Sequence, residues 1–455
     1  MREPFTIREF DSIICENEKS ISEKYKQMPA KEFEALKEFI RNRTPDDDEA
    51  DSLEFMNISY SKRGVGDIIH VKNYVGMIQM QNGYQVEILP KIMFDKDSED
   101  RTKAVFIKML RSMKDFPCKV FTNANVATER MNLYEIFINM YISEVRELVK
   151  RGLKSAYVPR EDNLNFYKGK LMVNDQIKKN LAHKERFYVR YDEYQLNRPE
   201  NRIIKATLLK LEKITAEYAN AKGVRQLLTH FELVDASQNF HKDFAQVAID
   251  RNTKAYETVL QWSKVFLMNR SFTTFSGDDY ARALLFPMEK VFEAYVADNM
   301  KRVMRGTGWN VSTQDKGHYL FTEPKRFALR PDIVMTHKDY PPIILDTKWK
   351  RLIDNARKNY GISQTDMYQM YAYGKKYNTS EIWLLYPKNE GLEKLNGFTY
   401  DSGDDIKVHL FFVDVANIEE SLENLKALLE ENPPTEVPHE KTKTHLDEKR
   451  KIRPI

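Results

Sequence analysis

Cysteine is almost absent from this chain of 455 residues, which carries only Cys15 and Cys118. Two distant cysteines exclude a disulfide framework and a cysteine-rich zinc site, and they fit a reducing compartment. No stretch approaches the ~18 consecutive apolar residues of a membrane span, and the start, MREPFTIREFDS, lacks the apolar segment of a signal peptide. We therefore expect a soluble, cytoplasmic protein without a membrane partner.

An excess of charge of one sign is also lacking, because 72 Lys and Arg balance 68 Asp and Glu to a net charge of +4. The total charge does not predict a polyanionic partner, although a local basic patch can still bind nucleic acid. The sequence contains no G-x-x-x-x-G-K-[ST] loop, and no helix-turn-helix, zinc-finger or RRM signature. We expect that the chain itself binds no nucleotide.

The residues that are present predict a multidomain α+β protein. At roughly 150 residues per domain, the length predicts two to four domains. Residues 1–105 are expected to form an α+β module, in which Asn82-Gly83 between short apolar segments predicts a β-hairpin. Apolar residues at three- and four-residue spacing predict a mainly helical middle region over 106–270.

The C-terminal part is expected to be an α/β domain over residues 271–428. Residues 271–287 are interpreted as a loop that leads into this domain. A helix, a run of strands, a second helix and further strands then predict a mixed central sheet flanked by helices. Residues 429–455 are charged and contain prolines, so we expect a disordered tail.

An insertion over residues 163–201 interleaves Lys and Arg with Tyr and Phe. Such a mixture can hold a phosphate backbone and stack on bases. It also fits an amphipathic hairpin whose long side chains cover its own apolar surface, or a contact with a partner protein.

The segment RPDIVMTHKDYPPIILDTKWK, residues 330–350, contains the strongest catalytic candidates. A hairpin that turns in its middle places Asp332 across from about Thr347 and beside Asp346. Asp346 and Lys348 are two residues apart, so their side chains leave the same face of a strand. Two carboxylates and one ammonium therefore converge at one end of a buried sheet.

Burial of these charges is costly unless a cation compensates them. Hard oxygen ligands suit Mg²⁺, with Mn²⁺ as a substitute. Such a metal polarises a phosphoryl oxygen and lowers the pKa of a bound water. Lys348 can position or deprotonate that water, or stabilise the developing negative charge. The pattern predicts phosphodiester hydrolysis; the alternative is a salt bridge at the edge of the sheet.

An acid-x-Lys tripeptide is common in so charged a chain, as Glu323-x-Lys325 and Asp405-x-Lys407 illustrate. The triplet that begins at Asp346 differs because it lies in an apolar strand and has a Pro-Asp pair one hairpin upstream. The pairing of the carboxylates therefore carries the prediction.

Two flanking helices offer further candidates. Glu289 and Glu293 are four residues apart on one helix face, so either can add a third carboxylate or be ordinary surface charge. Gln369 and Tyr373 share a face of the downstream helix, where the amide can orient catalytic groups and the tyrosine can support it. Simple core or boundary positions are the alternative.

A helix glutamate, Pro-Asp, Asp-x-Lys and Q-x-x-x-Y, in this order, resemble the RecB-like branch of the PD-(D/E)XK nuclease superfamily. The resemblance implies that Asp332 and Asp346 bind the metal and that Lys348 is the catalytic lysine. It favours Glu293 over Glu289 as the helix acid. The implied catalytic set is Asp332, Asp346, Lys348, Glu293, Gln369 and Tyr373.

The chain as a whole resembles the McrC family of McrBC- and LlaJI-type restriction systems. The segments VGMIQMQNGYQVEILPKI, FYKGKL, NRIIKATL and DMYQMYAYG carry this resemblance. It implies an Mg²⁺-dependent endonuclease subunit that acts on double-stranded DNA in phage defence, in a GTP-dependent and modification-dependent complex. It further implies that the N-terminal half docks on, and stimulates, a hexameric AAA+ GTPase resembling McrB.

Two other interpretations remain open. One is a stand-alone PD-(D/E)XK nuclease of repair or recombination, which would cut DNA without a nucleotide-hydrolysing partner. The other is a non-catalytic activator of a partner GTPase, which the intact set of Asp332, Asp346 and Lys348 disfavours.

Overall fold

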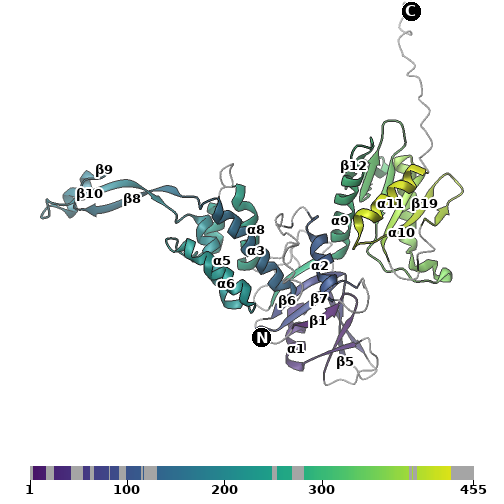
Figure 1. Cartoon of the computed structure of the whole chain (residues 1–455), viewed down its shortest axis with the longest axis horizontal. Coiled ribbons are helices and arrows are strands. Elements are labelled where there is room, and N and C mark those ends of the chain that lie inside the picture. Colours follow the sequence, from purple (N-terminus) through teal and green to yellow (C-terminus); the bar gives the residue numbers. More distant parts are fainter. Residues whose placement is uncertain are drawn as a thin grey trace, which may run out of the picture. The chain divides into compact units, whose positions relative to one another are not determined.

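The computed structural model (Figure 1) accounts for most of the chain. The described residues are 4–16, 25–41, 55–61, 66–80, 82–91, 99–113, 116, 131–247, 254–268, 281–388, 392 and 397–431. Cys118, the acidic segment after residue 41 and residues 432–455 of the expected tail lie outside them.

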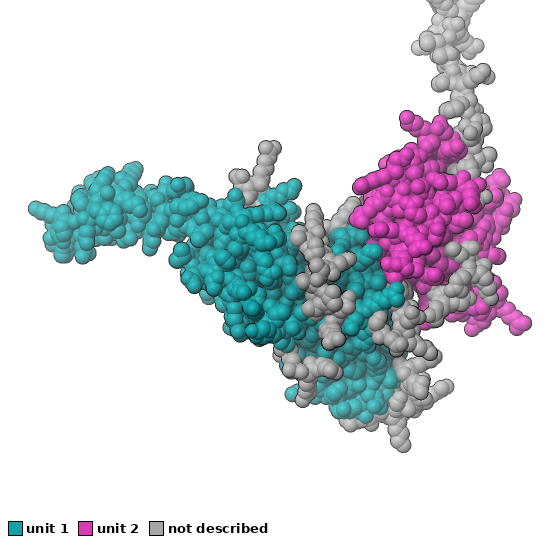
Figure 2. Space-filling model, in the orientation of Figure 1, with its two compact units in different colours: residues 1–291 teal, residues 292–455 magenta. Residues whose placement is uncertain are grey.

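The chain divides into two compact units, residues 1–291 and 292–455, which Figure 2 colours separately. The division falls within helix α9 (Met288–Val303). Helices and several mixed sheets make up the units, so the α+β class expected from the sequence is confirmed. The finer division into four regions stays a prediction.

Unit 1 begins with two four-stranded sheets. Their orders are β3-β2-β5-β4 and β1-β7-β6-β11, with β2/β3 and β1/β7 parallel and the other pairs antiparallel. Helix α1 (Ala30–Arg41) buries Phe33 and Leu36 in a core shared with both sheets. The strands are β1 (Phe5–Arg8), β2 (Ser12–Cys15), β3 (Tyr25–Met28), β4 (Met56–Ser61), β5 (Gly66–Val71), β6 (Tyr74–Met80) and β7 (Gln85–Leu89).

The hairpin expected at Asn82-Gly83 is present. β6 and β7 pair with Gly76 opposite Ile88, and the Tyr84 N–H donates to Oδ1 of Asn82 at 3.0 Å. Gly83 has φ +80°, a left-handed conformation that glycine adopts without strain. This turn accounts for the Asn-Gly pair.

The prediction of a loop over 271–287 is wrong for the last seven residues, because Ala281–Pro287 forms strand β11. β11 pairs with β6 in unit 1, with Leu285 opposite Gly76. Leu284, Leu285 and Phe286 are all buried. An uninterrupted apolar run of this kind suits a strand that is covered on both faces. The sequence does not indicate the pairing, because β6 lies far from β11 along the chain.

The middle of unit 1 is helical, as the spacing predicts. α3 is capped by Asn132, whose side chain accepts from the Glu135 N–H at 2.9 Å. Buried aromatic rings join these helices: Tyr141 of α3 lies edge to face on Phe266 of α8, with ring centroids 5.6 Å apart. The helices are α2 (Glu99–Leu110), α3 (Leu133–Lys150), α5 (Pro199–Ile214), α6 (Tyr218–Leu228), α7 (Phe240–Gln246) and α8 (Glu257–Met268).

An arm projects from this helical block (Figure 1). It consists of the long antiparallel strands β8 (Ala156–Leu164) and β10 (Phe187–Gln195), the short strand β9 (Lys170–Leu171) and helix α4 (Val173–Lys179). Gly169 allows β9 to approach β10, because a Cβ there would lie 2.4 Å from the Arg190 carbonyl oxygen.

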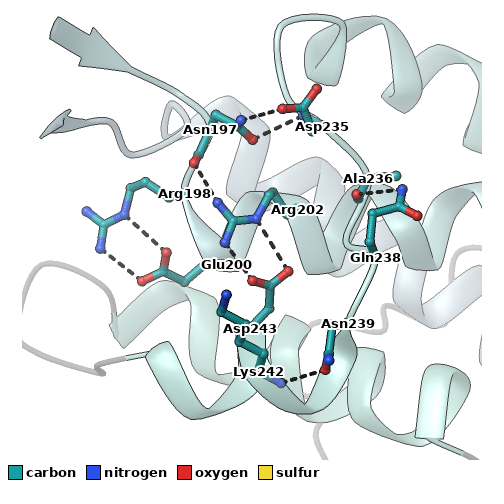
Figure 3. Close-up of polar contacts among 10 residues, drawn as sticks. All are labelled: Asn197, Arg198, Glu200, Arg202, Asp235, Ala236, Gln238, Asn239, Lys242 and Asp243. Carbon is teal, nitrogen blue, oxygen red and sulfur yellow. Dashed lines mark hydrogen bonds and ion pairs between the residues drawn. The ribbon is translucent and has the colours of Figure 1, made fainter. Parts of the chain in front are cut away.

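Ion pairs and hydrogen bonds anchor the root of the arm where β10 leads into α5 (Figure 3). The Arg202 guanidinium donates to the Asn197 carbonyl at 3.0 Å and pairs with Asp243 of α7. Burial alone would raise the pKa of Asp243, but the bonds from Arg202 hold it below its usual value. The side chain of Asn197 in turn binds Asp235 through two hydrogen bonds of 2.6 and 3.1 Å. The arm therefore leaves the helices from a fixed point.

Unit 2 is built on a six-stranded sheet of order β12-β15-β16-β17-β19-β18. β16/β17 and β17/β19 are parallel, and the remaining pairs are antiparallel. The strands are β12 (Asn310–Thr313), β15 (Ile333–Thr336), β16 (Ile343–Thr347), β17 (Glu381–Pro387), β18 (Thr399–Asp401) and β19 (Lys407–Val413). A separate hairpin joins β13 (Tyr319–Thr322) to β14 (Lys325–Ala328).

The central strands β16 and β17 are buried on both faces, as near-continuous apolar sequences favour. Helix α10 (Gln364–Tyr377) packs Met370, Tyr373 and Tyr377 against one face. Helix α11 (Ile418–Glu431) follows β19. In the described part of the chain, no helix is long and apolar enough to cross a membrane.

Candidate active site

The two predicted carboxylates meet at the end of the β15–β16 hairpin. Ile333 pairs with Leu345, so the same register continued by one residue sets Asp332 against Asp346. The sequence placed Asp332 across from about Thr347, one position away. Thr347 nevertheless binds it, donating from its N–H at 2.8 Å and from Oγ1 at 2.7 Å to Oδ2 of Asp332.

Burial makes this pair of carboxylates electrostatically costly. Asp346 is 1% exposed. Burial and then the charge of Asp332 raise the pKa of Asp346 to about 7. Burial also raises the pKa of Asp332, although the hydrogen bonds from Thr347 oppose the shift. A neighbouring cation would relieve both effects.

Lys348 supplies one positive charge. Its Nζ lies 2.6 Å from Oδ2 of Asp346 and donates to Oε1 of Gln369 at 3.2 Å. Burial alone would lower the pKa of Lys348, but the attraction to Asp346 outweighs it and raises the pKa. The side chain is therefore held as an ammonium ion.

Helix α10 brings the downstream pair to the same place. Nε2 of Gln369 donates to the Tyr373 hydroxyl at 2.6 Å, so the amide is oriented between Lys348 and the tyrosine. Tyr373 is buried in the core of the sheet. Burial and the charge of Asp346 raise the pKa of Tyr373, which keeps its hydroxyl protonated.

Glu293 is connected to the centre through Gln314. The Gln314 side chain donates to Glu293, and its backbone N–H donates to the Asp332 carbonyl at 3.1 Å. Glu289, the weaker candidate, is exposed on the first turn of α9. Five of the six predicted residues are joined by direct contacts or by interactions between their charges. The sixth, Glu293, is connected to them through Gln314.

The sequence analysis did not single out a second ion pair at this site. Nζ of Lys350 lies 2.7 Å from Oδ2 of Asp366, which is 8% exposed. The charge of Asp366 contributes to the raised pKa of both Asp346 and Lys348. Two signals were available, because Lys350 continues the alternation of Asp346 and Lys348, and Asp366 opens the segment DMYQMYAYG.

The donor set suits a small, hard cation. Among the described residues, no three His, Cys, Asp or Glu side chains form a group that could hold a metal ion. Two buried carboxylates with water and a substrate phosphate as further ligands are, however, the usual environment of Mg²⁺ in phosphoryl-transfer sites. Asp332 and Asp346 fit that role.

The arm contains most of the basic and aromatic insertion predicted over 163–201, but it begins earlier, at Ala156, and residues 199–201 belong to α5. Exposed aromatic side chains include Tyr157, Phe166, Tyr167 and Tyr194. Ion pairs neutralise only part of its basic residues: Arg160 pairs with Glu193 across the strands, and one further cross-strand pair and one helical pair follow. Exposed aromatic rings are typical of protein interfaces, so the arm suits a contact with a partner protein.

Comparison with known proteins gives the chain a family. The model of the "McrBC 5-methylcytosine restriction system component" matches residues 69–387. The chain belongs to the McrBC family. The resemblance drawn from the sequence is thereby confirmed, and this McrBC protein is a component of a restriction system.

One solved structure supports the fold, and a second is similar in part. The Thermococcus gammatolerans assembly of McrB AAA+ hexamers with bound McrC contains a chain that is 19% identical, with a TM-score of 0.68, over 93% of this McrBC protein and 100% of that chain. The T. gammatolerans McrBC complex also matches, at 21% identity and a TM-score of 0.47, over 66% of this chain and 88% of that one. None of the curated proteins that were compared matches the chain.

Proposed function

We propose that this McrBC protein is the endonuclease subunit of its restriction complex and hydrolyses phosphodiester bonds of double-stranded DNA with Mg²⁺. The observation that carries the proposal is the position of Asp332 opposite Asp346 at the end of a buried hairpin, with Lys348 in contact with Asp346. Unit 2, with its mixed sheet between helices and this order of motifs, then represents a PD-(D/E)XK nuclease domain.

The residues divide the work as follows. Asp332 and Asp346 would hold the Mg²⁺ ion, which supplies Lewis-acid activation of the phosphate and of the attacking water. Lys348, fixed by Asp346 and by the amide of Gln369, stabilises the negative charge that develops on the phosphate. Its raised pKa favours this role over that of a general base. Tyr373 keeps Gln369 aligned.

Removal of the metal tests the proposal when cleavage is compared with GTP turnover, because EDTA also removes the Mg²⁺ that nucleotide hydrolysis requires. In a reconstituted complex with a McrB-like GTPase, GTP and methylated duplex DNA, we expect EDTA to abolish cleavage. Excess Mg²⁺ restores it, and Mn²⁺ substitutes. Strand breaks are measured on supercoiled plasmid. Cleavage that continues at the same rate in EDTA contradicts a metal-dependent site.

The proposal extends to the partner. The T. gammatolerans structure contains McrB AAA+ hexamers with bound McrC. By analogy, this chain docks on a hexameric AAA+ GTPase through unit 1 and stimulates it. The arm is the candidate contact, because it presents exposed aromatic rings, which are typical of protein interfaces.

Shortening the arm tests this contact. Tyr157 and Tyr194 are opposite each other, so an Asn-Gly turn can replace residues 158–193 between them. Because the arm's aromatic rings are largely exposed, we expect an unchanged melting temperature but stimulation of the partner GTPase reduced about tenfold or more. GTP turnover is the measurement. Full stimulation by the shortened chain would show that the contact lies elsewhere. The alternative of a stand-alone nuclease is tested separately, because such an enzyme would cut DNA without any GTPase.

A further inference from the structure

The β13–β14 hairpin leaves the catalytic centre and returns to it. Gln314, just before the hairpin segment, binds the Asp332 carbonyl through its N–H and Glu293 through its side chain. Pairing continues with the Leu329 N–H donating to the His318 carbonyl at 2.9 Å. The segment 315–331 is therefore an excursion whose two ends are joined beside the carboxylate pair.

This hairpin carries two exposed rings. Phe321 is 55% exposed and Phe327 is 71% exposed, and their centroids lie 5.8 Å apart in an edge-to-face arrangement. Phe327 also has φ +57°, a left-handed conformation that bulky residues rarely adopt. Exposure and backbone strain both cost free energy. Such features gather at binding surfaces.

The charges beside the rings are two basic residues and one acidic residue, Glu323 in the turn, so their sum is positive. Lys325 and Arg326 are exposed on β14, and among the described residues Arg326 has no ion-pair partner. Rings flanked by unpaired cations suit DNA, in which phosphates surround stacked bases. Contact with a second copy of the chain would instead bring like charges together.

The distance to the catalytic centre is short. Phe327 precedes Asp332 by five residues, which span at most about 18 Å when fully extended. One turn of B-DNA is about 34 Å long, so the rings remain within roughly half a turn of a phosphate at Asp332. A duplex cut at this site can therefore extend as far as the hairpin.

We propose that the β13–β14 hairpin is a DNA-contacting element of the nuclease domain. Lys325 and Arg326 bind phosphates beside the scissile bond, and Phe321 and Phe327 pack against bases in the adjacent groove. This inference rests on the proposed nuclease function, because it takes duplex DNA as the substrate of the neighbouring carboxylates.

The test is DNA binding by the full-length chain in the absence of divalent cations. Anisotropy of a fluorescein-labelled 30-base-pair duplex gives the Kd. We expect Phe321→Ala and Phe327→Asn each to weaken binding roughly tenfold, which corresponds to about 1.4 kcal/mol, because each removes a ring that packs against the DNA. Asn tolerates the left-handed backbone at position 327, and Phe321→Trp should retain the affinity of the parent.

The basic pair and a matched control complete the set. Lys325→Ala combined with Arg326→Ala should lower the slope of log Kd against log salt by about two. Phe398, 42% exposed and 5.0 Å from Tyr400, precedes β18 at the opposite edge of the sheet. Phe398→Ala should bind DNA like the parent chain.

Two results overturn the inference. The first is DNA affinity of the Phe321 and Phe327 variants equal to that of Phe398→Ala. The second is a change in sedimentation with unchanged DNA affinity, which would make the hairpin a self-association surface. Either leaves metal-dependent cleavage by the parent complex intact. Failure of the nuclease proposal is distinguishable, because the parent complex would then not cut, or Asp346→Ala would cut normally.

Discussion

Asp346→Ala is expected to reduce DNA cleavage by the reconstituted complex to background while leaving assembly with the GTPase intact. The substitution removes one of the two carboxylates that would hold the metal, and it leaves Lys348 without its partner at 2.6 Å. Cleavage of methylated plasmid, GTP turnover and co-elution with the partner separate loss of chemistry from loss of the complex.

Lys348→Ala should cost roughly 10²–10³-fold in the cleavage rate, the usual effect of removing a donor that stabilises transition-state charge. The tripeptide Asp405-x-Lys407 provides the matched control, because it has the same spacing but both residues are exposed. Lys407→Ala should cut at the parental rate. Normal cleavage by Asp346→Ala and Lys348→Ala would refute the site, whereas equal losses at Lys348 and Lys407 would indicate a general effect of charge.

Gly76→Ala is expected to destabilise unit 1 by about 3 kcal/mol or more. Gly76 has φ +145°, and a Cβ on it would lie 1.9 Å from the Leu284 carbonyl oxygen of β11. The clash is with backbone, so a side-chain rotation cannot relieve it. β6 and β11 would have to separate at their centre.

The measurement is thermal or denaturant unfolding followed by circular dichroism. Gly83→Ala is the control, because its φ is +80° but no heavy atom lies within 4 Å of an added Cβ. It carries backbone strain alone and should cost about 1 kcal/mol. If Gly76→Ala and Gly83→Ala lower the free energy of unfolding by the same amount, the close approach of β11 to Gly76 does not determine stability.

The candidate site was predictable because its signal is local. Asp332, Asp346 and Lys348 lie within one hairpin, where strand alternation and the position of the turn place side chains to within a residue. The register error of one position arose in residues 337–342, whose turn geometry composition does not reveal. Gln369 and Tyr373 followed from helical spacing.

Non-local relations were not predictable in the same way. The pair of Lys350 and Asp366 bridges the end of β16 and the start of α10. Local signals mark each residue separately, but none of them indicates that the two side chains meet. β11 was interpreted as a loop, since its partner β6 lies some two hundred residues earlier. Which strands pair depends on packing in three dimensions, and a single sequence contains little information about it.

The position of β11 also determines where the chain can be cut. β6 is buried along its whole length as an interior strand between β7 and β11. A nuclease fragment that began at residue 271 would contain β11, with Leu284, Leu285 and Phe286, but not β6, the strand with which β11 pairs. The remaining N-terminal fragment would gain a bare apolar sheet edge. Both fragments would tend to aggregate through these edges. A chain divided for separate expression is therefore best divided after Pro287.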